Sequence, residues 1–264
     1  MIADHLPSAF EAHTRIKAAI GDRRIGFFLD FDGTLAPIAP RPDAALLPEK
    51  CRAVLEELGR HHLVCVLSGR ALDDLRRKTG LTDLYYAGDH GYRISGPQGS
   101  GVELRVGDEA RGELESAGRQ LRQRLADIPG VVLEMKEFSL SVHFRLAAIE
   151  DEPLIANAIE QVSARHPSLR MMEGKCVHEL RPAMDWGKGK AMLWILDRLA
   201  LDWRSLCPIV LGDDPTDEDM FRAAAGWGVC VLVGPAGQHT EAQYRLDTPE
   251  QTADFLARLR GVPG

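Results

Sequence analysis

The stretch IGFFLDFDGTL, residues 25–35, decides the fold class. Ile25–Leu29 is apolar on consecutive residues, which is typical of a strand buried on both faces of a parallel sheet. Asp30 and Asp32 follow directly, and ligands bind at the carboxyl ends of strands in open α/β sheets. Gly33 permits a tight turn that presents N–H groups to an anion. The stretch predicts a buried strand that ends in a binding site, although alone it also fits an Asx-type turn with a solvated aspartate.

Outside residues 107–183, short apolar runs alternate with helical segments. The predicted strands are Leu63–Leu67, Leu84–Ala87, Ile209–Leu211 and Val229–Val233. Helices are expected from Pro48, whose apolar residues recur at helical spacing, over about 189–200 and over about 248–260. This alternation predicts an α/β fold with an open, mostly parallel sheet.

The middle of the chain follows a different pattern. Residues 107–183 give the order helix, strand, strand, helix, strand, strand, and the strands follow each other in pairs. Directly consecutive strands favour an antiparallel sheet with one solvated face. We therefore predict a discontinuous core domain, residues 1–106 and 184–264, and an inserted α+β domain with an antiparallel sheet over residues 107–183.

Composition excludes several classes of protein. The chain has 264 residues, with 32 Lys and Arg against 39 Asp and Glu, and a formal net charge of −7. Hydrophobic residues at 45% and charged residues at 27% exclude disordered and fibrous proteins. The acidic balance argues against a nucleic-acid partner. No apolar run approaches about 18 residues, so no membrane span is expected.

The five cysteines are scattered and form no C-x-x-C pair. Cys65 and Cys230 lie inside apolar runs, which is typical of small buried residues in a reducing compartment. The first ten residues lack the basic and apolar regions of a signal peptide. These features predict a cytoplasmic protein.

Two further polar motifs stand where a strand meets a helix. Ser68-Gly69-Arg70 follows the strand Leu63–Leu67, so Ser68 is either a helix N-cap or a phosphate seat. Lys188 stands between two glycines before a helix, where it is either a solvated side chain or a point charge for a phosphate. Lys190 competes for the same role.

A run of acids follows the strand Ile209–Leu211, from Asp213 to Asp219. Clustered carboxylates repel each other unless a cation compensates. The spacing lacks the ligands and the glycine of an EF-hand loop, whereas Mg²⁺ typically binds one or two carboxylates, waters and a substrate phosphate. Part of the run also suits a helix cap, with Thr216 or Asp217 near the helix start.

In chain order, these motifs resemble the four motifs of the haloacid-dehalogenase-like phosphatases: D-x-D-G-T-L, S-G-R, K-G and G-D-D-x-T-D. More narrowly, other segments resemble trehalose-6-phosphate phosphatases, and the resemblance covers roughly residues 24 to 235. Those segments are AGDHG at 87–91, Glu134-x-Lys136, HFR at 143–145 and GKCVHELRP at 174–182. The resemblance implies a Rossmann-like core with an α+β cap, and hydrolysis of trehalose 6-phosphate as the last step of trehalose biosynthesis.

The resemblance also implies roles for single residues. Asp30 is the expected nucleophile that forms an aspartyl-phosphate, and Asp32 the expected general acid and base. Ser68 and Lys188 are expected to hold the phosphoryl oxygens. The expected Mg²⁺ site comprises Asp30, the Asp32 carbonyl, Asp213, Asp214 and Asp217. The remaining expected substrate contacts are Gly33, Thr34, Arg70 and His90 in the core and Glu134, Lys136, Arg145, Lys175 and Glu179 in the cap.

Three rival functions remain open at this stage. A phosphatase for a sucrose-type or mannosyl-type phosphate would keep the chemistry and change the cap contacts. A sugar phosphomutase shares the first motif, and a non-catalytic sugar-phosphate sensor would need no nucleophile. We expect a monomer or a weak homodimer.

Overall fold

The computed structural model describes residues 6–39, 41–174, 176–235 and 239–261. The chain divides into two compact units, one formed by Met1–Leu104 with Trp186–Gly264 and the other by Arg105–Asp185. In the described part of the chain, none of the helices has the length and apolarity that a membrane-spanning helix needs.

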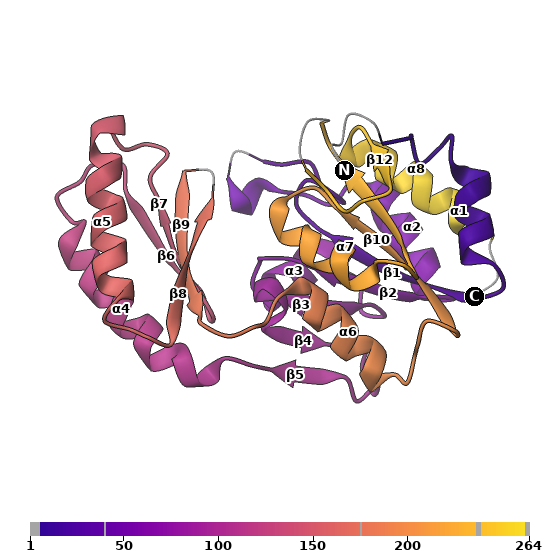
Figure 1. Ribbon diagram of the computed structural model, residues 1–264, viewed down its shortest axis with the longest axis horizontal. Coiled ribbons are helices and arrows are strands. Elements are labelled where there is room, and N and C mark those ends of the chain that lie inside the picture. Colours follow the sequence, from indigo (N-terminus) through magenta and orange to yellow (C-terminus); the bar gives the residue numbers. More distant parts are fainter. Residues whose placement is uncertain (1–5, 40, 175, 236–238, 262–264) are drawn as a thin grey trace. The chain divides into compact units, whose positions relative to one another are not determined.

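The larger unit is built on an eight-stranded sheet in the order β12-β11-β10-β1-β2-β3-β4-β5 (Figure 1). β1 is central and pairs in parallel with β10 and β2, so the carboxyl ends of these strands meet at one edge. The strands of this sheet are β1 (Arg24–Asp30), β2 (Leu63–Leu67), β3 (Tyr85–Gly88), β4 (Arg93–Ser95), β5 (Glu103–Arg105), β10 (Leu206–Gly212), β11 (Val229–Val233) and β12 (Tyr244–Leu246).

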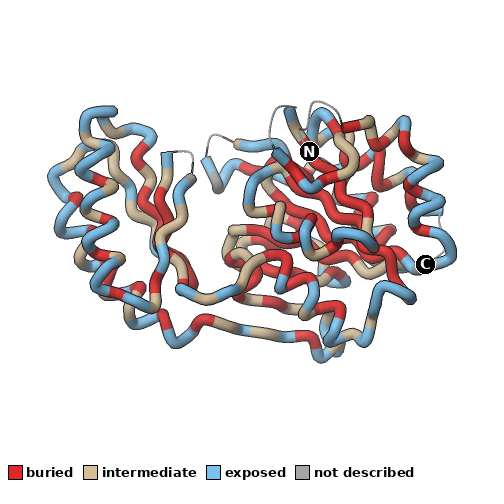
Figure 2. Tube along the Cα trace, in the orientation of Figure 1, coloured by how far each residue is buried: buried red, intermediate tan, exposed pale blue. Residues whose placement is uncertain are grey.

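Helices cover both faces of this sheet, which explains its consecutive apolar residues. Phe27 packs into one core cluster with α1, α2, α3 and α8, whereas its neighbour Phe28 packs into a second cluster with α6 and α7. Figure 2 shows the strands buried along most of their length. The helices of the unit are α1 (His13–Ile20), α2 (Glu49–Gly59), α3 (Leu72–Thr79), α6 (Lys188–Arg198), α7 (Glu218–Ala224) and α8 (Pro249–Leu259).

The smaller unit holds an antiparallel four-stranded sheet in the order β6-β7-β9-β8. Its two helices, α4 and α5, pack on one face of the sheet through a third apolar cluster. Its elements are α4 (Arg111–Arg124), β6 (Val132–Met135), β7 (Leu140–His143), α5 (Glu152–Ser163), β8 (Leu169–Gly174) and β9 (Val177–Pro182). The opposite face is polar, because Glu134, Ser141 and Glu179 lie side by side across three strands.

Four of the five cysteines are buried, and all five are free. Cys65 and Cys230 lie inside the core, as their apolar surroundings predict. His62 is half-buried, its ring packs edge-on against Phe27 at 5.6 Å between ring centroids, and burial lowers its pKa.

Candidate active site

The carboxyl ends of β1 and β10 bring two aspartates together. Asp30 is the last residue of β1 and is only 4% exposed, and Asp213 directly follows β10. Thr34 donates from its hydroxyl to Asp213 Oδ1 at 3.2 Å. Gly33 has a φ of +84°, and a Cβ there would collide with the Asp213 carboxylate. The turn after β1 therefore needs glycine both for its backbone and for this close approach.

Lys188 neutralises part of this acidic edge. It begins α6, is 3% exposed, and its ammonium donates to Asp30 Oδ1 and to Asp217 Oδ1, both at 2.7 Å. Burial opposes the charged form of Lys188, but Asp217 and Asp30 outweigh burial and raise its pKa well above its ordinary value. Lys190, the competitor in sequence, is exposed.

The acidic loop after β10 holds itself in place. Asp217 is fully buried, and its Oδ2 accepts the backbone N–H groups of Asp213 at 3.0 Å and Asp214 at 3.2 Å. Asp214 is exposed, and its Oδ1 accepts the backbone N–H and the hydroxyl of Thr216. The two acids form a reciprocal capping box around the short 3-10 helix Pro215–Asp217, which directly precedes α7. Asp217 is the N-cap residue of α7 but makes no side-chain cap there, so the capping role in the acid run belongs to Asp214.

The donor set of this edge fits a divalent cation. One carboxylate oxygen from each of Asp30, Asp213 and Asp217 lies within 4.8 Å of the others. Burial holds the pKa of Asp30 well above its ordinary range, against the pull of Lys188, and Asp217 and Asp213 add to the shift. Burial, with repulsion from Asp217, raises the pKa of Asp213 to about 7. These carboxylates outnumber the single buried ammonium, and hard oxygen donors suit Mg²⁺.

In two of the five expected metal ligands, Asp214 and Asp32, the side-chain carboxylate is hydrogen-bonded to another residue of the protein. Asp214 lies outside the three-carboxylate cluster found among the described residues, and it caps Thr216 instead. The Asp32 carboxylate is bound by Arg70, and only the Asp32 backbone carbonyl was expected as a ligand.

Ser68 does not cap a helix, which corrects one of the two readings of its position. α3 begins at Leu72 and has Ala71 as its N-cap, whereas Ser68 Oγ accepts the N–H of Arg70 at 3.1 Å within the turn after β2. The Ser68 side chain is buried at the carboxyl end of β2, beside β1. The phosphate-binding role of Ser68 stays a prediction.

His90 packs against the S-G-R turn. Its backbone N–H donates to the Ser68 carbonyl at 2.9 Å, and its φ is +56°. The ring lies so close to Gly69 that a Cβ at this glycine would collide with it. The neighbouring Asp89 also has a positive φ, of 50°, so two consecutive non-glycine residues hold an uncommon backbone conformation here.

The polar face of the smaller unit carries paired charges. Glu134 Oε2 lies 3.0 Å from His143 Nε2, and this hydrogen bond lowers the pKa of Glu134. Glu179 is 8% exposed and accepts from Ser141 Oγ at 3.2 Å and from Arg181 Nε at 2.7 Å. Two other expected cap residues complete this picture: Lys136 lies 3.8 Å from Glu179, and Arg145 is exposed in the turn after β7. Lys175 lies outside the described residues.

The sequence model of the trehalose-phosphatase family matches residues 28–250. The chain belongs to the trehalose-phosphatase family. The family resemblance of the motifs is thereby confirmed. The trehalose-phosphate phosphatase of Mycobacterium tuberculosis (strain ATCC 25618 / H37Rv) is 39% identical over 258 residues, which cover 96% of this chain. The chain spans 66% of the length of that relative.

Solved structures agree with the fold. The C-terminal domain of the Candida albicans trehalose-6-phosphate phosphatase has a TM-score of 0.78 at 25% identity, covering 98% of this chain and all of that one. A haloacid-dehalogenase-like hydrolase from Bacillus subtilis has a TM-score of 0.60 at 18% identity, covering 88% of this chain and 99% of that one. The predicted fold class, a parallel α/β core with a separate antiparallel sheet, is confirmed.

Two side chains of these sites were not singled out from the sequence. Arg181 lies within a family-like segment, yet its ion pair with Glu179 depends on their shared position on one face of β9. Asp74 accepts from Arg70 at 3.1 Å, one turn along from it. The spacing of four residues between Arg70 and Asp74 was the one available signal for this pair.

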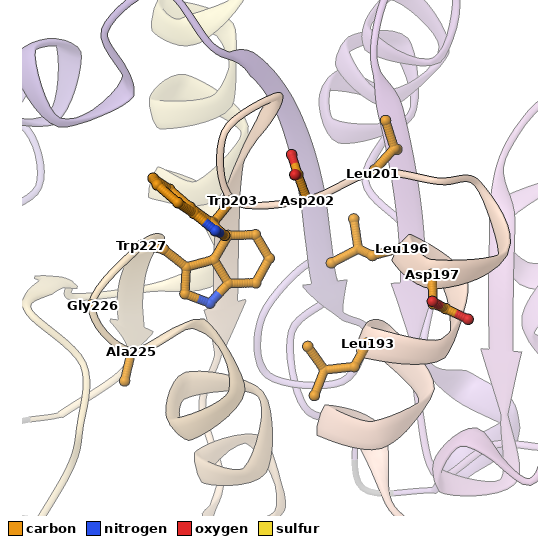
Figure 3. Close-up of a pocket in the computed structure, with 9 residues that line it drawn as sticks. All are labelled: Leu193, Leu196, Asp197, Leu201, Asp202, Trp203, Ala225, Gly226 and Trp227. Atoms are coloured by element: carbon orange, nitrogen blue, oxygen red, sulfur yellow. The ribbon is translucent and has the colours of Figure 1, made fainter.

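A separate apolar pocket of about 570 Å³ lies at the amino ends of β10 and β11 (Figure 3). It is lined by the end of α6 and by the loops before these two strands, which carry Trp203 and Trp227. The carboxylate cluster follows the carboxyl end of β10, so the pocket and the cluster lie at opposite ends of the same parallel strands.

Proposed function

We propose that the protein hydrolyses trehalose 6-phosphate to trehalose and phosphate through an aspartyl-phosphate. The observation that carries the proposal is the buried contact of Lys188 with Asp30 and Asp217, at the edge where Asp213 also lies. Family membership supports the substrate, and a buried carboxylate at the end of β1 supports a nucleophile. A pure binding protein would have no need of that carboxylate.

The proposed reaction has two displacement steps at phosphorus. Asp30 attacks the phosphorus, the bond to the sugar oxygen breaks, and Asp32 gives that oxygen a proton. Water then attacks the phosphoryl group on Asp30, Asp32 takes a proton from the water, and phosphate leaves. Ser68 and Lys188 hold the phosphoryl oxygens in both steps, where fixed donors stabilise the developing charge. Gly33 and Thr34, which shape the turn after β1, complete the proposed phosphate site.

The metal site is the second part of the proposal. Asp30 and Asp213 would bind Mg²⁺ with the Asp32 backbone carbonyl, and Asp217 would hold Lys188 and the acidic loop in place. When bound, the ion reduces the repulsion between a phosphate dianion and the Asp30 carboxylate.

We further propose that the smaller unit acts as the cap that binds the sugar. Glu134, Lys136 and Glu179 offer donors and acceptors on one sheet face, which suits hydroxyl groups because each of them both donates and accepts. Arg145 and Lys175 stay predicted sugar contacts, as does His90 from the core. A cytoplasmic location and a monomeric or weakly dimeric state also stay predictions.

Phosphate release from a panel of sugar phosphates tests this function. We expect metal-dependent release from trehalose 6-phosphate, far faster than from glucose 6-phosphate, sucrose 6-phosphate or mannose 6-phosphate. Chelation with EDTA should abolish the release, and added Mg²⁺ should restore it. A preference for another sugar would disprove the substrate, and turnover without released phosphate would indicate a mutase.

Glu134→Ala tests the sugar site. We expect kcat/KM for trehalose 6-phosphate to fall roughly 10- to 100-fold, the loss typical when a charged group no longer hydrogen-bonds its substrate, with little change for p-nitrophenyl phosphate. Glu173→Ala is the matched control, because Glu173 pairs with His178 on the other face of the same sheet. Equal losses on both substrates would remove Glu134 from the sugar site.

A further inference from the structure

The Arg70 guanidinium donates two hydrogen bonds to the Asp32 carboxylate, one to each oxygen. Its Nε donates to Asp32 Oδ2 and its Nη2 to Asp32 Oδ1, each at 2.6 Å. A bidentate guanidinium–carboxylate pair fixes both the position and the plane of the carboxylate. Arg70 was expected among the substrate ligands, but its guanidinium is engaged with Asp32.

The rest of the protein holds Arg70 in turn. Its Nη1 donates to Asp74 Oδ2 at 3.1 Å, and its guanidinium lies over the Phe31 ring at 5.5 Å from the centroid. Its backbone N–H donates to Ser68 Oγ, and its carbonyl accepts the N–H of Asp89 at 2.7 Å. The Arg70 side chain is only 10% exposed, which leaves little of its surface for a substrate.

We infer that Arg70 is a positioning residue, which orients the Asp32 carboxylate for proton transfer and does not bind the substrate. The inference rests on the proposed function, in which Asp32 is the general acid and base. Acid–base groups act only within hydrogen-bond reach of the proton they transfer, so a carboxylate free to rotate transfers protons poorly. Asp74 and Phe31 contribute to the same positioning, because both contact the Arg70 guanidinium and hold it in place against Asp32.

Substrates with different leaving groups distinguish the positioning of Asp32 from a role of Arg70 in phosphate binding. A sugar oxygen needs a proton as it leaves, whereas p-nitrophenolate leaves unprotonated, so loss of Asp32 spares the first step with p-nitrophenyl phosphate. The second step needs Asp32 as a base with either substrate. A variant with a mispositioned Asp32 therefore accumulates phosphoryl-enzyme and releases one equivalent of p-nitrophenol in a burst before slow turnover.

The experiment compares burst kinetics of Arg70→Met, Arg70→Lys and Asp32→Asn with those of the wild type. We expect Arg70→Met to behave like Asp32→Asn, with a one-equivalent burst and a kcat for trehalose 6-phosphate lowered by about 100-fold, within the range of general acid–base catalysis. Arg70→Lys keeps the positive charge but cannot donate two parallel hydrogen bonds to Asp32, so its kcat should lie between that of Arg70→Met and that of the wild type. Arg77→Met is the matched control, because Arg77 contacts Asp74 at 3.0 Å from the exposed side of α3.

A double-mutant cycle completes the test. Added to Asp32→Asn, the Arg70→Met change should have no further effect on burst or turnover. A further loss in that background would overturn the inference. The inference would also be overturned if Arg70→Met raised KM for both substrates without a burst, which would indicate that Arg70 binds the phosphate. An equal loss of kcat on both substrates with a lowered melting temperature would likewise overturn it, because that result indicates a purely structural role.

The wild-type reactions separate this inference from the proposed function. If the wild type hydrolyses p-nitrophenyl phosphate and a different sugar phosphate, the substrate proposal fails, and the same comparison with that sugar phosphate still decides the role of Arg70. If the wild type hydrolyses neither class of ester, the proposed function fails and the inference about Arg70 fails with it.

Discussion

Asp30→Asn should abolish hydrolysis of trehalose 6-phosphate, by at least about 10⁴-fold, because an amide oxygen is too weak a nucleophile to displace the sugar. The fold should survive. The change keeps the side-chain volume, Lys188 retains Asp217, and one of the mutually repelling buried carboxylates is neutralised. Steady-state phosphate release measures the activity, and thermal unfolding measures the stability.

Asp127→Asn is the control, since Asp127 is an exposed aspartate of the smaller unit and should keep full activity. Activity of Asp30→Asn close to that of the wild type would show that another group attacks phosphorus. A large fall in its melting temperature would instead show that Asp30 is needed for folding.

Lys188→Met should cost both activity and stability. Removing the ammonium leaves Asp30 and Asp217 buried without their cation, and breaking a buried ion pair from one side costs about 3–5 kcal/mol. For a chain of this size, that loss of stability lowers the melting temperature of the larger unit by roughly 10 °C. Phosphate release should fall below detection, because the phosphoryl group loses its buried cationic donor.

Two comparisons make this result specific. Lys190→Met should retain activity and stability, because Lys190 is exposed on the same helix. Combining Lys188→Met with Asp30→Asn should recover part of the lost stability, since one of the unpaired carboxylates is then neutral. Loss of activity in Lys190→Met with full activity in Lys188→Met would exchange the roles of the two lysines.

Strands buried on both faces were predicted well, because a run of consecutive apolar residues marks them in the sequence. Leu63–Leu67 and Val229–Val233 have the bounds expected from their unbroken apolar runs. β10 is longer than its predicted core, Ile209–Leu211, because Pro208 interrupts the apolar run and separates Leu206 and Cys207 from it. β4, β5 and β12 were not predicted, since strands of three residues near a sheet edge bury too few apolar side chains to show a period.

The site could be predicted as a set of residues but not as a set of contacts. Strand ends placed Asp30, Ser68 and Asp213 near one edge, because parallel strands bring their carboxyl ends together. The choice between Lys188 and Lys190 depends on where α6 begins, and sequence patterns locate helix ends only to within a few residues. The pairing of Arg70 with Asp32 joins residues 38 apart in the chain and depends on packing alone.

The most direct test of the central claim is a rapid quench of the enzyme during turnover of trehalose 6-phosphate. Borohydride reduces an aspartyl-phosphate to homoserine, so mass spectrometry of the peptide that contains Asp30 reports the site of attack. We predict homoserine at position 30 in the wild type, together with released phosphate, and neither in Asp30→Asn. Phosphate release with an unmodified Asp30, or with the phosphoryl group on another residue, would contradict the account.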